Sequence, residues 1–252
     1  MAGDAIMHFY DQDYQNPESV SFKTDNSPVT RADKISHQII DEELRKLDPA
    51  IPVLSEEGMI IPFEERQKYR RLWIVDPLDG TREFIDKNGE FTIHIGLVES
   101  GNPILGVVYA PATRTMWWGV KRGGSFRGDI DGIHQLKVNS LDMKSSGIKI
   151  THSRSHMDKA TDIYIRSFDK PTTIPMGSSL KFMKIAEGEF DIYPKMSSKM
   201  KEWDTCAPQI ILEEAGGMVV CVEKGRPLEY NKEELTQPDF LAMGNLIAYY
   251  EY

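Results

Sequence analysis

The sequence predicts a protein of the α+β or α/β class, with helices on a mainly antiparallel sheet followed by a second α/β unit. Two observations carry this prediction. Residues 91–127 hold alternating and β-branched segments separated by turn residues, a pattern typical of antiparallel strands. After residue 146, short apolar runs alternate with helical patterns. We therefore expect one unit over residues 1–145 and another over residues 146–252.

The first unit is expected to begin with helices. A short helical pattern covers Ala2–Tyr10. A longer helix is expected from Thr30 to about Leu47, because isoleucine and leucine recur there at helical spacing before Pro49. The apolar run Ile51–Glu57 then predicts a short strand that ends in two carboxylates.

The sheet of the first unit is expected between residues 72 and 127. Leu72–Val75 is a continuous apolar run, which is typical of a strand buried on both faces. Phe91–Val98 and Ile104–Tyr109 predict two strands joined by a hairpin at Gly101-Asn102. Two further antiparallel strands are expected at Thr115–Val120 and Gly124–Arg127.

The second unit is expected to alternate strands with helices. The predicted strands are Gly147–Thr151, Thr172–Pro175, Phe190–Tyr193 and Gly217–Val222. The predicted helices are Asp158–Ser167, Ser179–Glu187 and Asp204–Ala215. Gly216-Gly217 would stop the last of these helices.

Composition excludes several classes of function. The chain has 252 residues, a net charge of −9 and two cysteines. The negative charge opposes a polymeric nucleic-acid partner, and no apolar run approaches the ~18 residues of a membrane span. Cys206 and Cys221 match no zinc spacing and are expected to be reduced. We expect a cytoplasmic monomer or homodimer without a signal peptide, and peripheral association with the inner membrane stays open.

The segment DPLDGT, which starts at Asp76, is the most informative motif. Pro77 biases Asp76 towards an extended conformation, and Gly80 permits the sharp turn expected next. In such a turn the carboxylates of Asp76 and Asp79 and the carbonyl of Leu78 can share one small volume. These hard oxygen donors suit Mg²⁺.

Gly80 and Thr81 are expected at the start of a helix, where free N–H groups favour a phosphate. The alternative is a solvated turn in which Thr81 only caps the helix.

Two more acidic positions follow the same pattern. Glu56 and Glu57 come after a short strand, and neighbouring strand residues point to opposite faces, so Glu56 is our choice as a ligand. Asp204 opens a helix. Taken alone, a glutamate pair lies most often at the surface and Asp204 would be an N-cap. Together with the first motif, they indicate a site with four carboxylates.

The segments SEE, WIVDPLDGT and EWD, in this order, resemble the inositol monophosphatase superfamily of Mg²⁺-dependent phosphatases. AGDAIM, KTDNSPVTRAD, NGEFTIHIGLV, PILGVVYAP, SRSH and GSSLKF are similar to its CysQ-type 3′(2′),5′-bisphosphate nucleotidases. The resemblance spans nearly the whole chain and implies a layered αβαβα fold. Such proteins usually carry most of a helix before AGDAIM, so a short first helix is expected.

The resemblance also implies the roles of individual residues. Two or three Mg²⁺ ions would be bound by Glu56, Asp76, the Leu78 carbonyl, Asp79 and Asp204. Phosphate would be bound by Asp79, Gly80 and Thr81, with Arg82 beside them and Glu56 and Asp204 at the same site. The catalytic set would be Asp33, Thr81 and Glu56, in which Thr81 pairs with Asp33 to orient or deprotonate the attacking water.

Substrate specificity is expected to come from the second unit. The segments SRSH and GSSLK offer hydroxyl, imidazole, backbone N–H and cationic donors. The expected contacts are Ser153, His156, Gly177, Ser178, Ser179 and Lys181. From sequence alone, a serine that caps a helix and a solvated Lys181 are equally good alternatives.

These features predict a phosphatase that removes the 3′-phosphate of adenosine 3′,5′-bisphosphate by in-line attack of water, without a phosphoenzyme. A further candidate substrate is 3′-phosphoadenylyl sulfate. One alternative is an inositol-phosphate or sugar-phosphate phosphatase, and another is a non-catalytic, metal-dependent nucleotide sensor. His94 is expected to pack or hydrogen-bond, and the basic segment Lys195–Lys201 is either a solvated loop or close to the substrate.

Overall fold

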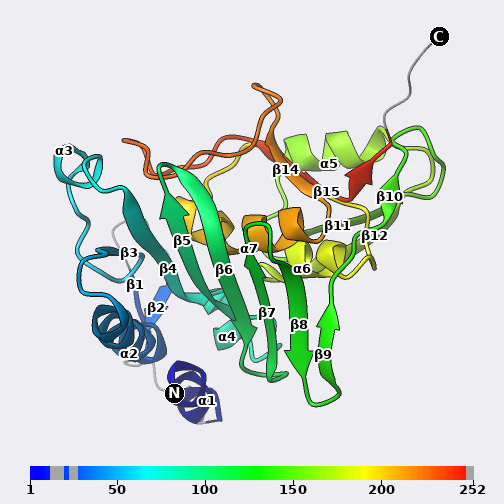
Figure 1. The fold of residues 1–252 in the computed structure, drawn as a ribbon. Helices are drawn as coiled ribbons and strands as arrows, with labels where there is room; N and C mark the ends of the chain where they lie inside the picture. The colour runs from blue at the N-terminus through cyan, green and yellow to red at the C-terminus, as the bar shows by residue number, and fades with distance from the viewer. Residues whose placement is uncertain (12–19, 23–27, 248–252) are drawn as a thin grey trace.

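The structure is a computed structural model that describes residues 1–11, 20–22 and 28–247; residues 23–27 of the KTDNSPVTRAD segment lie outside this part. Helices and sheets alternate in five layers (Figure 1). The order of the layers is α1 (Ala2–Asp11) with α2 (Arg31–Leu47), a seven-stranded sheet, α6 (Leu180–Ala186) with α7 (Glu202–Glu214), a five-stranded sheet, and α5 (Lys159–Arg166). The layered αβαβα expectation is therefore confirmed.

The seven-stranded sheet has its strands in sequence order. They are β3 (Val53–Ser55), β4 (Arg71–Asp79), β5 (Thr92–Glu99), β6 (Asn102–Ala110), β7 (Thr115–Val120), β8 (Gly124–Asp129) and β9 (Gly132–Gln135). The first pair is parallel and all later pairs are antiparallel. Two short helices, α3 (Phe63–Arg66) and α4 (Thr81–Ile85), flank β4 in the chain.

The second sheet is mixed. Its order is β12 (Thr172–Met176), β11 (Lys149–Ser153), β13 (Ile192–Lys195), β15 (Phe240–Met243) and β14 (Met218–Cys221). β15, which the sequence analysis missed, runs antiparallel to both of its neighbours. Two small ribbons complete the fold, β1 (Val20–Phe22) with β2 (Pro28–Thr30) and β10 (Ser140–Leu141) with β16 (Asn245–Leu246).

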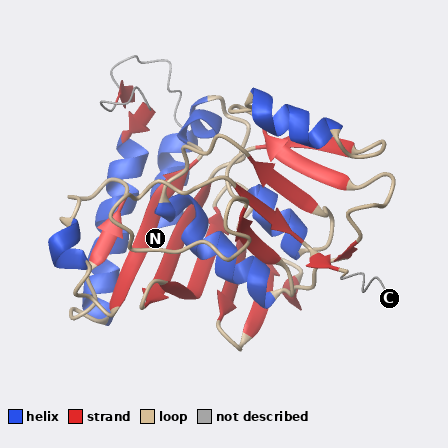
Figure 2. Ribbon diagram, turned by 90° about the horizontal axis from the view of Figure 1, so that it is seen from above, coloured by secondary structure: helices blue, strands red, loops and turns tan. Residues whose placement is uncertain are grey.

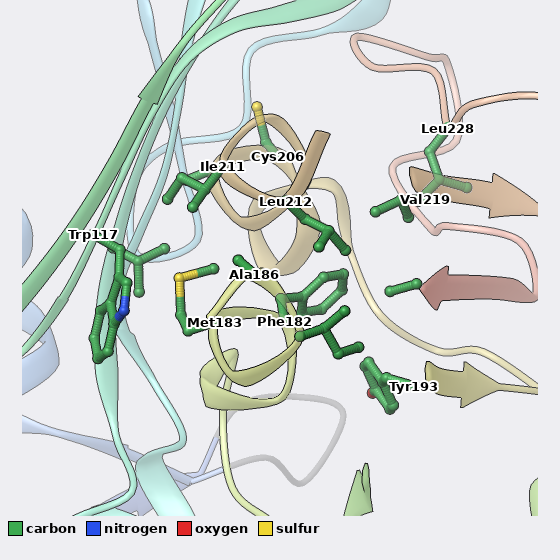
Figure 3. Packing of buried hydrophobic residues seen from close by; sticks show 14 of the residues in the cluster. Trp117, Phe182, Met183, Ala186, Tyr193, Cys206, Ile211, Leu212, Val219 and Leu228 are labelled. Carbon is green, nitrogen blue, oxygen red and sulfur yellow. The ribbon is translucent and has the colours of Figure 1, made fainter. Parts of the chain in front are cut away.

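The main core lies between the two sheets. Figure 2 shows the sheets from above with helices between them. Figure 3 shows Phe182 and Met183 of α6 between Trp117 of the first sheet and Val219 of the second. A second apolar cluster, which includes Ile6 of α1, fills the space under α1 and α2. In the described part of the chain, no helix is long and apolar enough to cross a membrane.

A row of glycines lets α7 lie very close to the first sheet. Gly96, Gly106 and Gly119 are cross-strand neighbours on β5, β6 and β7. A Cβ atom on Gly106 would lie 2.5 Å from the carbonyl oxygen of Ala207, and one on Gly96 would lie 2.5 Å from Sγ of Cys206. Real Cβ atoms do not approach so closely, so any larger side chain would push the helix outward. The three glycines thus set the distance between α7 and the first sheet.

Candidate active site

A bulge in β4 brings two aspartates to one face of the sheet. Asp76 pairs with His94 and Asp79 pairs with Thr92, so three steps along β4 match two steps along β5. In a regular strand, residues three apart point to opposite faces, and the extra residue of a bulge cancels this alternation. The strand therefore continues to Asp79, and the sharp turn expected within DPLDGT comes only at Gly80, whose φ is +89°.

Two further carboxylates reach this face from other elements. Glu56 follows β3 directly, and its N–H donates to the carbonyl of Val75 on β4 at 3.1 Å. Asp204 arrives on the first turn of α7. One ligand oxygen each from Asp76, Asp79 and Asp204 all lie within 4.8 Å of one another. The charge of Glu56 acts on both Asp76 and Asp204, so it belongs to the same cluster.

The carboxylates repel one another in a poorly solvated place. Burial raises the pKa of Asp76 well above its ordinary value, and the charges of Glu56, Asp79 and Asp204 raise it further. Burial and the charges of Asp79 and Glu56 raise the pKa of Asp204 to about 7. A divalent cation would relieve this repulsion, and carboxylate oxygens are the donors that hard cations prefer. The residues present therefore fit a metal site.

Asp204 is not the N-cap that the sequence suggested. The N-cap of α7 is Lys201, and Asp204 is the third helical residue. Its Oδ2 accepts the N–H of Lys201 at 2.6 Å in a capping-box arrangement. Oδ2 of Asp204 thus satisfies a free N–H at the start of the helix, while Asp204 also belongs to the acidic cluster.

Asp33 and Thr81 meet beside the cluster. The hydroxyl of Thr81 donates to Oδ1 of Asp33 at 3.1 Å, although α2 and α4 are distant in sequence. Oδ2 of Asp33 accepts the N–H of Thr30 at 2.7 Å and its hydroxyl at 2.5 Å. Burial raises the pKa of Asp33 to about 6 despite the hydrogen bonds from Thr30. Asp33 is thus a stronger base than a solvated aspartate, and Thr81 is not a mere helix cap.

The serines of GSSLK contact the metal-site carboxylate. Ser178 donates its hydroxyl to Oδ2 of Asp79, and the N–H of Ser179 donates to the same oxygen at 2.8 Å. Ser179 occupies the N-cap position of α6 but makes no side-chain capping bond. The capping alternative is therefore wrong for Ser179. A substrate contact by either serine stays a prediction.

His94 packs and hydrogen-bonds, as the sequence predicts, but it does so beside the acidic cluster, a location that the sequence did not indicate. Its side chain is completely buried. Nε2 lies 2.7 Å from the Ser179 hydroxyl and 3.3 Å from Oδ2 of Asp79, and Nδ1 lies 3.2 Å from the Trp203 carbonyl. The charge and hydrogen bond of His94 and the hydrogen bond of Ser178 outweigh burial, so the pKa of Asp79 lies below its ordinary value. The sequence signal for His94 is that it is a histidine among the mainly apolar residues of the segment FTIHIGL.

Cationic side chains gather around His156, in a segment that is expected to contact the substrate. Burial lowers the pKa of His156, and the positive charges of Arg82, Lys195 and Lys181 lower it further, against the charge of Glu83. Nζ of Lys195 lies 3.3 Å from the His156 carbonyl, and Lys195 is buried, so this first residue of the basic segment is no solvated loop residue. Arg82 and Lys195 thus place positive charge around the His156 imidazole, while Lys195 also pairs with Asp158 at 3.4 Å.

Other expected contact residues already have hydrogen-bond partners within the chain. Arg154 binds Glu90 through two hydrogen bonds of 2.8 and 2.6 Å, and the Gly177 N–H donates to the same carboxylate at 2.6 Å. The Ser153 hydroxyl accepts the His156 N–H at 3.1 Å.

Lys181 is only 4% exposed and donates to the carbonyls of Met176 and Ser178, so the solvated alternative is wrong for it. Burial lowers its pKa to about 8 against the charges of Asp79 and Glu83.

Comparisons with known proteins agree with one another. The model of the inositol monophosphatase family matches residues 2–250. The chain is 42% identical over 240 residues to the 3′(2′),5′-bisphosphate nucleotidase CysQ of Escherichia coli (strain K12), which covers 95% of this chain and 94% of the relative. The crystal structure of CysQ from Bacteroides thetaiotaomicron superposes with a TM-score of 0.83 at 34% identity and covers 96% of this chain and 93% of the other. An IMPase of Thermotoga maritima superposes with a TM-score of 0.77 at 26% identity, over 96% and 87% of the two chains.

Proposed function

The chain belongs to the inositol monophosphatase family, and we propose that it is a Mg²⁺-dependent 3′-phosphatase of adenosine 3′,5′-bisphosphate that releases AMP and phosphate. We include 3′-phosphoadenylyl sulfate as a second substrate. The observation that carries the proposal is the carboxylate cluster with a Thr81–Asp33 pair at its edge. The similarity to the 3′(2′),5′-bisphosphate nucleotidase CysQ supplies the nucleotide class.

The carboxylates of Glu56, Asp76, Asp79 and Asp204 and the Leu78 carbonyl would hold the metal. Bound there, two or three Mg²⁺ ions would neutralise the carboxylates, attract a phosphate dianion and make water a better nucleophile. The remaining steps belong to the chain itself. The Thr81 hydroxyl already donates to Asp33, so its lone pairs are directed elsewhere and can accept a proton from the attacking water. Thr81 then passes its own proton to Oδ1 of Asp33.

Asp33 is suited to this role because Thr30 fixes its other oxygen through two hydrogen bonds. The reaction needs no covalent intermediate, since water attacks in line as the 3′-oxygen leaves. Gly80 is the N-cap of α4 and Thr81 is its first residue, so N–H groups there can contact the transferred phosphate.

The area around His156, where Arg82 and Lys195 place positive charge, supports a substrate with two anionic groups. An inositol monophosphate has one phosphate, which the metal site would take. In adenosine 3′,5′-bisphosphate, the second phosphate needs a cation of its own. The Arg82 side chain is exposed and can therefore reach a bound substrate. We therefore assign the 5′-phosphate to this area.

The test is phosphate release from adenosine 3′,5′-bisphosphate, inositol 1-phosphate and fructose 1,6-bisphosphate, with Mg²⁺ and with EDTA. We expect the nucleotide to give the highest kcat/KM and EDTA to abolish turnover. A higher kcat/KM on either sugar ester would make the chain a sugar-phosphate phosphatase. Tight nucleotide binding without turnover would make it a sensor.

Arg82→Met tests the second phosphate separately. It should raise KM for adenosine 3′,5′-bisphosphate about tenfold, a typical loss for one charge-assisted contact. It should affect adenosine 3′-monophosphate much less. Arg122→Met, at an exposed arginine in the turn before β8, is the matched control. Equal effects of Arg82→Met on both nucleotides would contradict the assignment.

A further inference from the structure

His94 occupies the junction of the three elements that surround the acidic cluster. It lies on β5, directly opposite Asp76 of β4 in the ladder. Its Nε2 faces the Ser179 hydroxyl, which precedes α6, and its Nδ1 faces the Trp203 carbonyl, which belongs to the first turn of α7. One imidazole thus contacts Ser179, which hydrogen-bonds to Asp79, and Trp203, which precedes Asp204 in sequence.

The hydrogen bonds around Nε2 form a closed network. Nε2 lies 2.8 Å from the Thr92 hydroxyl, which in turn lies 2.5 Å from the Ser178 hydroxyl and 3.0 Å from the Ser179 hydroxyl. Both serines donate to one oxygen of Asp79, its Oδ2. That oxygen has its donors from the protein, so Oδ1 is the oxygen that Asp79 can present to a cation.

The other end of the imidazole restrains α7. The Trp203 carbonyl accepts only, so Nδ1 carries the proton in this contact. Trp203 is the residue before Asp204, and the glycine row already sets how close α7 lies to the sheet. The bond to Nδ1 therefore adds a second restraint on the first turn of α7, at the residue before Asp204.

We propose that His94 is a positioning residue for the metal site, which aligns Asp79 through Nε2 with Ser178 and Ser179 and aligns Asp204 through Nδ1. The proposal rests on the proposed function in that the acidic cluster binds the metal of the reaction. Residues outside a coordination sphere that orient its ligands commonly change metal affinity ten- to a hundredfold when removed.

The test measures Mg²⁺ binding by titration calorimetry and Mn²⁺ binding by electron paramagnetic resonance, both without substrate. His94→Leu should weaken binding of both ions about tenfold or more. His94→Gln, whose amide reaches the position of Nε2 but not that of Nδ1, should restore part of the affinity. In steady-state assays, His94→Leu should require more Mg²⁺ for half-maximal rate, and KM at saturating Mg²⁺ should change little.

Smaller changes keep the test decisive if His94→Leu does not fold. Ser179→Ala and Thr92→Val each remove one hydroxyl of the network and should weaken Mg²⁺ binding several-fold. Ser125→Ala is the matched control for Ser179→Ala, because the Ser125 hydroxyl is buried and makes no hydrogen bond to the described residues. It should leave Mg²⁺ affinity unchanged.

The outcomes separate this inference from the proposed function. If the network variants lose stability but keep the wild-type affinity for Mg²⁺, His94 is structural only and the inference is wrong. If the wild type binds Mg²⁺ with the expected dependence on His94 but hydrolyses no phosphate ester, the inference stands and the proposed phosphatase activity fails.

Discussion

Replacing Asp204 with asparagine should stabilise the metal-free protein at pH 8. Burial and the charges of Asp79 and Glu56 raise the pKa of Asp204 from 3.8 to about 7. Because the folded pKa lies above the unfolded one, ionising Asp204 lowers the stability of the fold. The loss is complete above about pH 7 and disappears as the pH falls towards 3.8. Asparagine removes the charge and keeps an oxygen for the Lys201 N–H.

The size of the effect follows from the shift. About three pKa units correspond to about 4 kcal/mol at 1.36 kcal/mol per unit. That figure is a ceiling, because the other carboxylates can take up protons and relieve part of the repulsion themselves. We therefore expect about 2 kcal/mol at pH 8, which raises Tm by about 4–8 °C for a chain of this size.

The assay is thermal unfolding of the wild type and Asp204→Asn in EDTA and in excess Mg²⁺, at pH 8 and at pH 5. In EDTA, the variant should be the more stable protein at pH 8, and the difference should shrink at pH 5. Mg²⁺ should stabilise the wild type much more than the variant. Asp86→Asn, at an exposed aspartate, should show neither effect. A variant less stable than the wild type in EDTA at pH 8 would refute the argument from repulsion.

Three further outcomes are expected. Thr81→Ala should lower kcat about 100-fold through loss of the proton relay, whereas Thr81→Ser should stay within about tenfold in steady-state assays. Because burial raises the pKa of Asp33 to about 6, kcat/KM should fall as the pH drops through about 6 and the base is protonated. Asp33→Asn should abolish this pH dependence and most of the activity, and a pH–rate profile of both proteins measures the difference. Gly106→Ala should destabilise the protein by about 1–3 kcal/mol in urea unfolding, because its Cβ would contact Ala207.

The carboxylates could be predicted from sequence because most of them mark the end of a strand or the first turn of a helix. Asp76 is the exception, since it lies within β4 and is recognised only through the motif that it shares with Asp79. Pro77 and Gly80 make the end of β4 visible in a single sequence. Strand alternation predicts that only one of Glu56 and Glu57 reaches the site, and the fold shows that the charge of Glu56 acts on the cluster. The bulge in β4 was not predictable, since nothing in DPLDGT distinguishes one extra strand residue from a tight turn. Only the ladder with β5 shows that Asp76 and Asp79 share a face.

Partners from distant elements were hidden for a different reason. The sequence offers Ser178 and Ser179 as caps or substrate donors with equal weight, and only the tertiary fold directs them to Asp79. β15 was missed because a four-residue run carries too little pattern to predict a strand. β9 was missed because all its residues are exposed and no alternation of buried side chains remains.

The glycine row and the acidic cluster have to be considered together. The expected ligands extend from residue 56 to residue 204 of the chain. Those before residue 80 meet on the first sheet, and Asp204 joins them only when α7 is seated on that sheet. Seating α7 concentrates negative charge, which opposes folding, while the close contact at Gly96 and Gly106 buries apolar surface, which favours it. A cation that binds the assembled cluster and not the unfolded chain must therefore shift the balance towards the folded state. Metal binding and the seating of α7 are thermodynamically linked, and a glycine substitution that lifts the helix should weaken the metal site as well as the fold.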